Sequence, residues 1–370
     1  MTVNELSLEG FRSYMNAGAQ FSPGTNIITG INAQGKTNLV EAVYYLTCGR
    51  SFRARTDSEI INFCCSEAVI RADITSGGRE QTVEARLFRG RRKTILINGV
   101  KQKTASALSG RLTAVLFCPD DLSMIRAGSA ARRRVLDQCL CQIRPRYAEA
   151  LTEYGRIYDQ KSRILKDWRE KPSLLEALDE YNDRMAEYGA ILIYYRARLA
   201  AALSERAEAI HRDFSGGAET LSLSYETVKT VEDPLSMKPD EIRQRLMEHQ
   251  VSHRRAELES GACLSGAHKD DLAVGINERP AKSFASQGQT RTAALSVKMA
   301  EREILAADTG ESPVLLLDDV LSELDAGRQD FVLNRVGGGQ VFITCCEDDR
   351  ISQKTGGRIF RITDGEIIPV

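Results

Sequence analysis

Residues 30–37 of this chain read GINAQGKT and match the pattern G-x-x-x-x-G-K-[ST], whose spacing builds a loop that binds phosphate. Gly30 and Gly35 let the backbone turn so that successive N–H groups point toward one anion. Lys36 is placed to reach the β- and γ-phosphates of a nucleotide, and Thr37 offers a hydroxyl to Mg²⁺. We expect the whole loop to contact the nucleotide: Gly30, Ile31, Asn32, Ala33, Gln34, Gly35, Lys36 and Thr37.

The segments on either side of the loop are those that the motif requires. Residues 26–29 form a short run rich in β-branched side chains, and residues 37–46 carry apolar side chains at helical spacing. A strand, a loop and a helix in this order place the phosphate at a helix N-terminus, where the helix dipole favours negative charge. The sequence therefore predicts a nucleotide site.

Two acidic residues follow an apolar run near the C-terminus. Residues 314–317 are all apolar and predict a buried parallel strand. Asp318 and Asp319 then emerge at its carboxyl end, where open α/β sheets bind ligands. We expect Asp318 to hold Mg²⁺ through a water and Asp319 to orient or deprotonate the attacking water, so the predicted catalytic residues are Lys36, Asp318 and Asp319. A core strand followed by a polar loop is the alternative.

A further candidate anion site precedes a predicted helix. Residues 284–289 read FASQGQ, about 30 residues before the acidic pair. A serine and a glycine at a helix start can bind a second anion, although an ordinary helix N-cap has the same residues. Residues 322–325, SELD, directly follow the acids.

Composition describes an ordinary globular protein. The formal net charge is −1, so any binding of a polyanion must come from local basic patches. No apolar run of 18 residues and no signal-peptide pattern occur, which predicts a cytoplasmic protein without a membrane span. The nine cysteines lack metal-site spacing, and we expect Cys118, Cys345 and Cys346 to be buried reduced thiols.

The order of predicted elements indicates three parts. Short alternating runs at 67–75, 80–89, 93–97 and 111–117 predict strands, and from about residue 129 the pattern becomes typical of helices. Helices are then expected at 130–143, 146–168 and 172–211, the last two as an antiparallel hairpin. Strands at 220–228, 271–276, 314–317 and 340–344 alternate with helices at 239–259, 289–307 and 325–336. The predicted domains are residues 1–128, 129–215 and 216–370.

The order and spacing of these motifs resemble the ABC-type ATPase heads of chromosome-maintenance and repair proteins, and more narrowly the RecF family of bacterial repair proteins. The matching text spans nearly the whole chain: residues 11–14 (FRSY), 49–53 (GRSFR), 117–122 (FCPDDL), 132–137 (RRRVLD), 266–272 (GAHKDDL), 286–289 (SQGQ) and 317–325 (LDDVLSELD). The resemblance implies an α/β fold, an ABC-type P-loop ATPase head with a β-rich N-terminal lobe and an inserted helical-hairpin arm.

The resemblance also implies a mechanism. Two copies form an ATP-dependent homodimer, in which Ser286 and Gly288 of one copy cap the γ-phosphate held by the other. Gln289 and Asp325 join this site, Arg12 lies near the phosphates, and the cofactors are ATP and Mg²⁺. The closed dimer binds single- and double-stranded or gapped DNA and works with RecO- and RecR-type partners in recombinational repair and replication restart, as a weak DNA-stimulated ATPase. The expected DNA contacts are Arg50, Arg53, Arg132, Arg133 and Arg134; helix salt bridges are the alternative for the last three.

Some positions depart from the family pattern. Asp319 replaces the glutamate usual in ABC ATPases, and its shorter side chain predicts slow hydrolysis. Thr290 and Lys269 replace a common Gln and Arg, and no histidine follows the strand at 340–344, where Thr344 is the candidate substitute. The competing interpretations are the ATP-binding subunit of a transporter and a small-molecule P-loop kinase. A kinase would be a monomer with an acceptor pocket, and it leaves the SQGQ and SELD segments unexplained.

Overall fold

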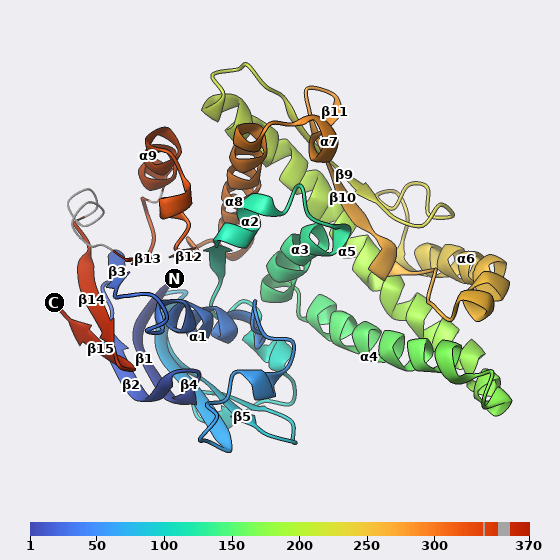
Figure 1. Ribbon diagram of the computed structural model, residues 1–370, viewed down its shortest axis with the longest axis horizontal. Helices are drawn as coiled ribbons and strands as arrows, with labels where there is room; N and C mark the ends of the chain where they lie inside the picture. The colour runs from blue at the N-terminus through green and yellow to red at the C-terminus, as the bar shows by residue number, and fades with distance from the viewer. Residues whose placement is uncertain (336, 347–355) are drawn as a thin grey trace. The chain divides into compact units, whose positions relative to one another are not determined.

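The computed structural model describes residues 1–335, 337–346 and 356–370, and it divides into two compact units (Figure 1). The first unit comprises Met1–Leu122 and Lys298–Val370, and the second comprises Ser123–Val297. The chain passes between them within the short helix α2 (Pro119–Ser123) and within the long helix α8 (Gln287–Thr309). Each unit is described by itself below.

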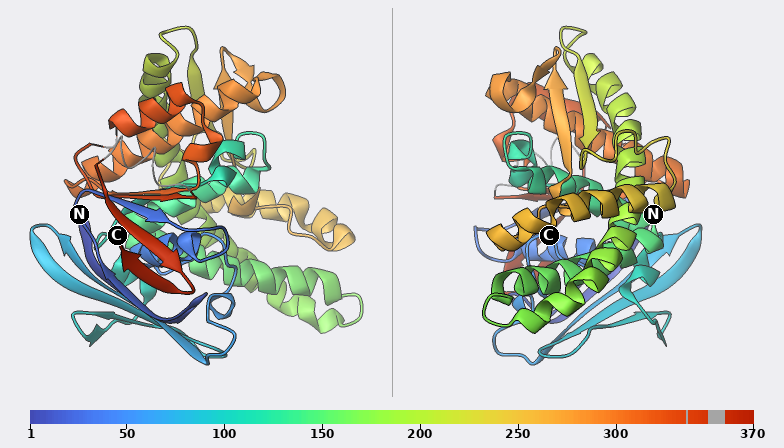
Figure 2. Two further views of the ribbon diagram at one scale, coloured as in Figure 1. Left: turned by 60° about the vertical axis from the view of Figure 1, so that its left-hand side comes forward. Right: turned by 90° about the vertical axis from the view of Figure 1, so that its right-hand side faces the viewer.

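An antiparallel sheet of six strands forms one layer of the first unit, in the order β2-β1-β4-β5-β6-β7. In both views of Figure 2 its blue and cyan strands lie together as one curved layer. Side chains alternate between buried and exposed along β4, because successive residues of a strand point to opposite faces. The strands are β1 (Thr2–Phe11), β2 (Tyr14–Gln20), β4 (Glu67–Ser76), β5 (Arg79–Phe88), β6 (Thr94–Ile97) and β7 (Val100–Lys101).

A second sheet of the same unit has the order β15-β14-β3-β13-β12-β8, and only β15 runs antiparallel to its neighbour. Every residue of β8, β12 and β13 is buried, which explains their continuous apolar runs. The parallel strands end at the same edge of the sheet. The strands are β3 (Thr25–Thr29), β8 (Ala114–Phe117), β12 (Val314–Asp318), β13 (Val341–Cys345), β14 (Arg358–Thr363) and β15 (Glu366–Pro369).

Helix α1 (Lys36–Cys48) packs against strands of both sheets, so nearly all of its side chains are buried. It begins directly after the loop that follows β3, and it ends at Gly49, whose left-handed backbone suits a glycine C-cap. Helix α9 (Ala326–Arg335) follows β12. The first unit thus presents the carboxyl ends of β3, β12 and β13 and the N-terminus of α1 to one place.

Four helices build most of the second unit. Helix α5 is 37 residues long and packs against α3, α4, α6 and β9. Gly189 lies inside α5 at a close contact, because a Cβ there would come within 3.2 Å of side-chain carbons of both Tyr154 and Leu246. The helices are α3 (Ser129–Ile143), α4 (Pro145–Asp167), α5 (Leu178–Phe214) and α6 (Pro239–Ser260).

A small antiparallel sheet, β11-β10-β9, completes the second unit together with α7 and the first part of α8. Arg196 of α5 ties this region to α3, since its buried guanidinium lies 2.9 Å from both the Asp137 and the Asp270 carboxylates. The remaining bounds are β9 (Leu221–Glu226), β10 (Asp271–Ile276), β11 (Arg279–Pro280) and α7 (Ala281–Phe284).

Within the described residues, the predicted helices and strands are found close to their expected positions, and residue 336, the expected end of the last helix, lies outside the described residues. The antiparallel pair α4 and α5 follows the predicted hairpin (Figure 1), but Pro172 opens a 3₁₀ segment, Pro172–Ala177, and α5 begins only at Leu178. Residues 216–297 group with the helices in the second unit, so the expected boundary at residue 215 does not coincide with a unit boundary. The division into three domains stays a prediction.

Candidate nucleotide-binding site

The loop at residues 30–37 connects β3 to α1 in a conformation that requires its glycines. Gly30 has φ +148°, and a Cβ there would lie 2.7 Å from the carbonyl oxygen of Ile362. Gly35 has φ +118°, and its Cβ would lie 2.7 Å from Ser13 Oγ. Residues with a Cβ rarely adopt such backbone angles, and a Cβ would also be too close to a neighbouring atom. Both the backbone angle and the lack of space therefore favour glycine at these positions. The Tyr14 hydroxyl also donates a 2.9 Å hydrogen bond to the Gly35 carbonyl, which fixes the loop to β2.

Lys36 lies inside the curve of the loop. Its side chain is almost fully buried, and its ammonium donates to the carbonyl of Gly30 at 2.7 Å and to that of Ile31 at 3.4 Å. It also lies 3.7 Å from Cys346 Sγ, just beyond β13. A buried ammonium beside the N-terminus of α1 supplies a positive environment suited to an anion.

The acidic pair lies at the end of β12, beside the loop. The Asp318 Oδ1 atom accepts hydrogen bonds from the hydroxyls of Thr37, at 3.0 Å, and Thr344, at 2.9 Å. Burial raises the pKa of Asp318, and the two hydroxyls act in the opposite direction. Thr344 reaches this place because β13 lies between β3 and β12 in the sheet. The structure therefore brings Lys36, Thr37 and Asp318 together.

Asp319 has an unusual backbone conformation, with φ +50°. Its N–H donates to Thr344 Oγ1 at 2.8 Å, so one threonine hydroxyl contacts both acidic residues. Aspartate tolerates the left-handed region better than most residues that have a Cβ. This conformation gives a local reason for the shorter acid at a position where the longer glutamate is usual in ABC ATPases.

Thr37 and Asp318 offer oxygen donors of the kind that Mg²⁺ prefers. The Thr37 hydroxyl and the Asp318 carboxylate lie side by side, 3.0 Å apart, next to the loop. Among the described residues no group of three or more His, Cys, Asp and Glu side chains could hold a metal. A donor set this small matches Mg²⁺, which keeps several waters and takes further oxygens from phosphates.

A buried glutamate, which the sequence analysis missed, organises the arginines near the loop. Glu41 of α1 is fully buried and accepts two hydrogen bonds from the Arg12 guanidinium, at 2.9 and 2.8 Å. Arg53, expected at a DNA surface, is exposed, and its guanidinium lies 3.3 Å from Asn38 Oδ1 and 3.9 Å from the Glu41 carboxylate. A glutamate within a helical pattern gives no signal of such a role, because its burial depends on distant segments.

The SQGQ segment belongs to the second unit, where it starts α8. Ser286 Oγ accepts the Gln289 N–H at 3.2 Å, and Gln289 Oε1 accepts the Ser286 N–H at 2.7 Å. This reciprocal pair is a capping box. Ser286 is exposed and Gly288 is half-buried. The N-cap interpretation therefore describes the local geometry, and it leaves the exposed hydroxyl of Ser286 with its own hydrogen for an anion.

Asp325 caps another helix. Its Oδ1 accepts the Arg328 N–H at 3.0 Å at the start of α9, and that bond is the largest cause of its lowered pKa. The Arg328 guanidinium also pairs with the carboxylate. In the first unit Asp325 is thus a helix N-cap, the ordinary role of an aspartate at this position.

The structure corrects the prediction for Arg132. Its side chain is 7% exposed. The guanidinium pairs with both Asp271 carboxylate oxygens at 2.7 Å and donates to the carbonyls of Ile125 and Ala127. It is a buried structural cation and not a surface residue for DNA. Arg133 is half-buried and donates to the Asp270 carbonyl, whereas Arg134 is exposed.

Three further expectations concern positions outside the loop. Arg50 is half-buried. All nine cysteines lie among the described residues and none is in a disulfide. Of the three expected to be buried only Cys345 is so, since Cys118 is half-buried and Cys346 is exposed. No helix in the described part of the chain is long and apolar enough to cross a membrane.

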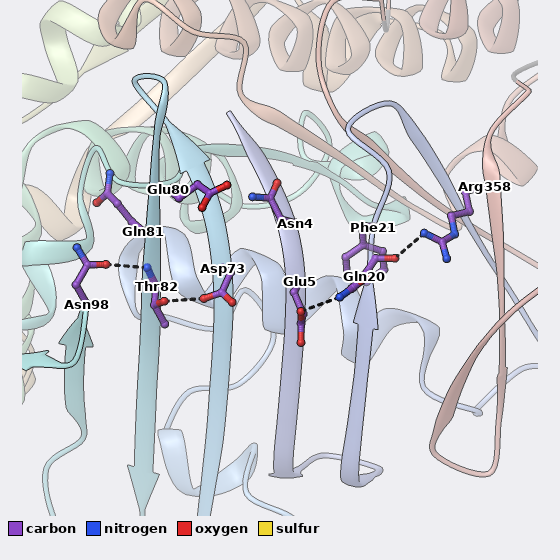
Figure 3. Close-up of a pocket in the computed structure, with 10 residues that line it drawn as sticks. All are labelled: Asn4, Glu5, Gln20, Phe21, Asp73, Glu80, Gln81, Thr82, Asn98 and Arg358. Carbon is purple, nitrogen blue, oxygen red and sulfur yellow. Dashed lines mark hydrogen bonds between the residues drawn. The ribbon is translucent and has the colours of Figure 1, made fainter.

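A polar pocket of about 520 Å³ lies elsewhere in the first unit, on the antiparallel sheet (Figure 3). Its side chains bond largely to one another, as in the contacts of Glu5 with Gln20 and of Asp73 with Thr82. None of the predicted site residues lines it. The lining residues are Asn4, Glu5, Gln20, Phe21, Asp73, Glu80, Gln81, Thr82, Asn98 and Arg358.

Comparison with known proteins agrees with this geometry. Residues 2–366 match the family described as the RecF/RecN/SMC N terminal domain. The DNA replication and repair protein RecF of Acetivibrio thermocellus is 36% identical over 357 residues, which cover 96% of each chain. The protein of the same name from Clostridium kluyveri is 36% identical over 369 residues, which cover 99% of each chain.

Solved structures give the same result. The recombination mediator protein RecF of the RecFOR pathway, determined with ATPrS, superposes with a TM-score of 0.90 at 32% identity and covers 100% of this chain and 98% of its own. The same mediator protein with ATP gives a TM-score of 0.88 at 32% identity, covering 100% and 97%. The Smc head domain of Pyrococcus furiosus shares the fold at 18% identity, with a TM-score of 0.52 and coverage of 100% and 95%. The predicted ABC-type α/β fold is thereby confirmed, and the chain belongs to the RecF family of DNA replication and repair proteins.

Proposed function

We propose that the chain binds ATP with Mg²⁺ at residues 30–37. The observation that carries this proposal is the convergence of the adjacent residues Lys36 and Thr37 with Asp318, which lies 281 residues after Thr37 in the sequence. Lys36 contacts the β- and γ-phosphates, and the loop N–H groups bind the remaining oxygens. Thr37 and Asp318 hold the ion, Asp318 through a water, and the ion neutralises charge on the phosphates. The relatives solved with ATP and ATPrS support this choice of nucleotide.

The nucleotide serves as the link of a homodimer. Ser286, Gly288 and Gln289 of one copy close over the γ-phosphate held by the other, with Asp325 near the same interface. The exposed hydroxyl of Ser286 and the start of the 23-residue helix α8 support this role. ATP then stabilises the dimer because it binds best to the closed state, and hydrolysis releases it.

Hydrolysis is slow, and Asp319 orients or deprotonates the attacking water. Its side chain is one methylene shorter than a glutamate, so it lies farther from a water bound at the γ-phosphate. The weak ATPase acts as a switch and is stimulated by DNA. Its rate sets how long the closed dimer persists.

The closed dimer binds single- and double-stranded DNA at gaps and acts in recombinational repair and replication restart with RecO- and RecR-type partners. The names of the relatives, all DNA replication and repair proteins, support this reading over a transporter subunit or a small-molecule kinase. Exposed arginines such as Arg53 and Arg134 supply phosphate contacts, with the half-buried Arg50 and Arg133 as weaker candidates. Such contacts are independent of sequence and sensitive to salt. The protein acts in the cytoplasm.

Sizing chromatography with ATP, ADP and no nucleotide tests the proposal, with Asp319→Asn included to block turnover. Lys36→Arg weakens nucleotide binding or turnover and loses the dimer, whereas Lys103→Arg, at an exposed lysine, behaves as wild type. Ser286→Arg retains ATP binding as a monomer and loses the dimer. The same preparations are then titrated with gapped DNA. A monomer at all concentrations with ATP would contradict the dimer, and nucleotide-independent or absent DNA binding would contradict the switch.

A further inference from the structure

A partly buried chain of hydrogen bonds supports the SQGQ segment in the second unit. Glu219, in the connection between α5 and β9, has a side chain that is 21% exposed. One carboxylate oxygen accepts the Gln289 amide N–H at 2.9 Å, and the other lies 3.0 Å from His211 Nε2. Glu219 therefore joins the end of α5 to the first turn of α8.

The contact from Glu219 determines which way the Gln289 amide points. A carboxylate only accepts hydrogen bonds, so the NH₂ group must face Glu219 and the carbonyl oxygen must face Ser286. That oxygen accepts the Ser286 N–H at 2.7 Å and completes the capping box. With the amide reversed, two oxygens would oppose each other at Glu219 and two donors at Ser286. The carboxylate thus fixes the backbone that presents the Ser286 hydroxyl.

His211 holds Glu219 from the opposite side. Its ring is fully buried, its Nδ1 lies 3.4 Å from Ser296 Oγ on α8, and burial lowers its pKa. A neutral imidazole that faces a carboxylate through Nε2 must carry its proton on that nitrogen, so it donates to Glu219. The carboxylate is therefore anchored by a rigid donor and cannot rotate away without leaving a buried group unpaired.

We propose that Glu219 is a positioning residue for Ser286 and that it acts through the side chain of Gln289. This inference rests on the proposed function, in which Ser286 contacts the γ-phosphate of a partner copy. Glu219 itself touches no nucleotide. Its removal should leave nucleotide binding by one copy intact and weaken the closed dimer only.

The test compares Glu219→Ala and Glu219→Gln with Glu226→Ala in the full chain. Glu226 is an exposed carboxylate at the end of β9 and serves as the matched control. ATP affinity is measured on the monomer at low protein concentration, and the dimer dissociation constant is measured with ATP by analytical ultracentrifugation. We expect Glu219→Ala to weaken the dimer at least tenfold, as the loss of about 1.4 kcal/mol from a charge-assisted hydrogen bond would. Glu219→Gln keeps an acceptor oxygen for the Gln289 amide, and its NH₂ group can donate to His211 Nε2 once the imidazole takes its other tautomer. This dimer should therefore stay within about threefold of wild type, and ATP affinity should be unchanged in all variants.

A double-mutant cycle with Gln289→Ala tests whether Glu219 acts on Ser286 through the side chain of Gln289. If Glu219 acts through Gln289, then Glu219→Ala adds little to the effect of Gln289→Ala. Full additivity of the two changes, or a Glu219→Ala dimer as tight as that of wild type, would overturn the inference while the proposed function stands. A wild-type protein that fails to dimerise with ATP would instead overturn the proposed function, and the inference with it.

Discussion

Replacing Thr344 with valine tests the geometry of the acidic pair directly. The hydroxyl of Thr344 donates to Asp318 at 2.9 Å and accepts the Asp319 N–H at 2.8 Å, and the side chain is only 2% exposed. Valine has nearly the same shape, so the packing of β13 should survive. The variant therefore removes two hydrogen bonds and little else.

The expected loss follows from the burial of the groups left behind. A buried donor or acceptor without a partner costs about 1–3 kcal/mol, and more when the group is charged. Asp318 keeps its bond from Thr37, whereas the Asp319 N–H loses the partner that holds a left-handed backbone in place. We expect the free energy of unfolding of the first unit to fall by about 2–4 kcal/mol. The pKa of Asp318, already raised by burial, should rise further, so the loss is largest at a pH where that carboxylate is ionised.

Hydrogen–deuterium exchange followed by mass spectrometry measures how well the backbone around Asp319 is protected in the full chain. The peptide that contains Asp319 should exchange faster in Thr344→Val, and urea unfolding followed by circular dichroism should show the lower stability. Thr344→Ser keeps the hydroxyl and should restore most of both signals. If valine and serine behave alike, or if the valine variant exchanges as wild type does, the hydroxyl does not hold the acidic pair as described.

Three further predictions concern buried and strained groups. Arg132→Ala should lower the free energy of unfolding of the second unit by about 2–3 kcal/mol, because it removes both charge-assisted hydrogen bonds to Asp271, which is 24% exposed and keeps its bond from the Leu272 N–H. The exposed Arg134→Ala should only reduce the salt dependence of DNA binding, and equal stabilities in urea would refute this contrast. Burial lowers the pKa of His268 to about 4 from 6.5, so the unfolded chain takes up the proton first as the pH falls. The free energy of unfolding should therefore decline by up to about 3 kcal/mol between pH 6.5 and pH 4, and urea titrations of His268→Gln should show that much less pH dependence. Asp319→Glu should raise ATP turnover and cost about 1 kcal/mol of stability at its φ of +50°, and unchanged turnover would refute a rate limited by the length of the acid.

The fold was predictable wherever local pattern and burial agree. Strands β8, β12 and β13 are buried along their whole length, so their apolar runs could be recognised without knowledge of their neighbours. The phosphate loop was equally accessible, because its glycines are required by backbone angles that the motif itself encodes. The N-terminal hairpin of β1 and β2 was missed, since β1 is a broken alternation and β2 includes small residues such as Ala17 and Gly18.

The supporting residues of the site were not predictable, because each depends on a contact across the fold. Glu41 is an ordinary helical glutamate until β1 brings Arg12 against it. Arg132 appeared in the sequence as one of a basic cluster, and only β10, which carries Asp271, turns it into a buried ion pair. A run of charged residues in the sequence does not show which of its side chains face solvent, because that depends on how the chain packs.

Because the supporting residues depend on contacts across the fold, substitutions of them test the proposed mechanism more specifically than substitutions in the motif do. Substituting the lysine of the phosphate loop should impair any protein that has this loop. The effect of a Lys36 substitution therefore identifies nucleotide binding and little more. Thr344 lies 26 residues from Asp318 and meets it only because β13 lies between β3 and β12. Glu219 lies 70 residues from Gln289 and, in the proposed dimer, positions the face offered to a partner copy. Defects at Thr344 should therefore appear in stability and turnover, and defects at Glu219 in dimerisation alone. A protein that shares only the phosphate-loop motif, without these supporting contacts, is not expected to show stability defects and dimerisation defects at separate residues.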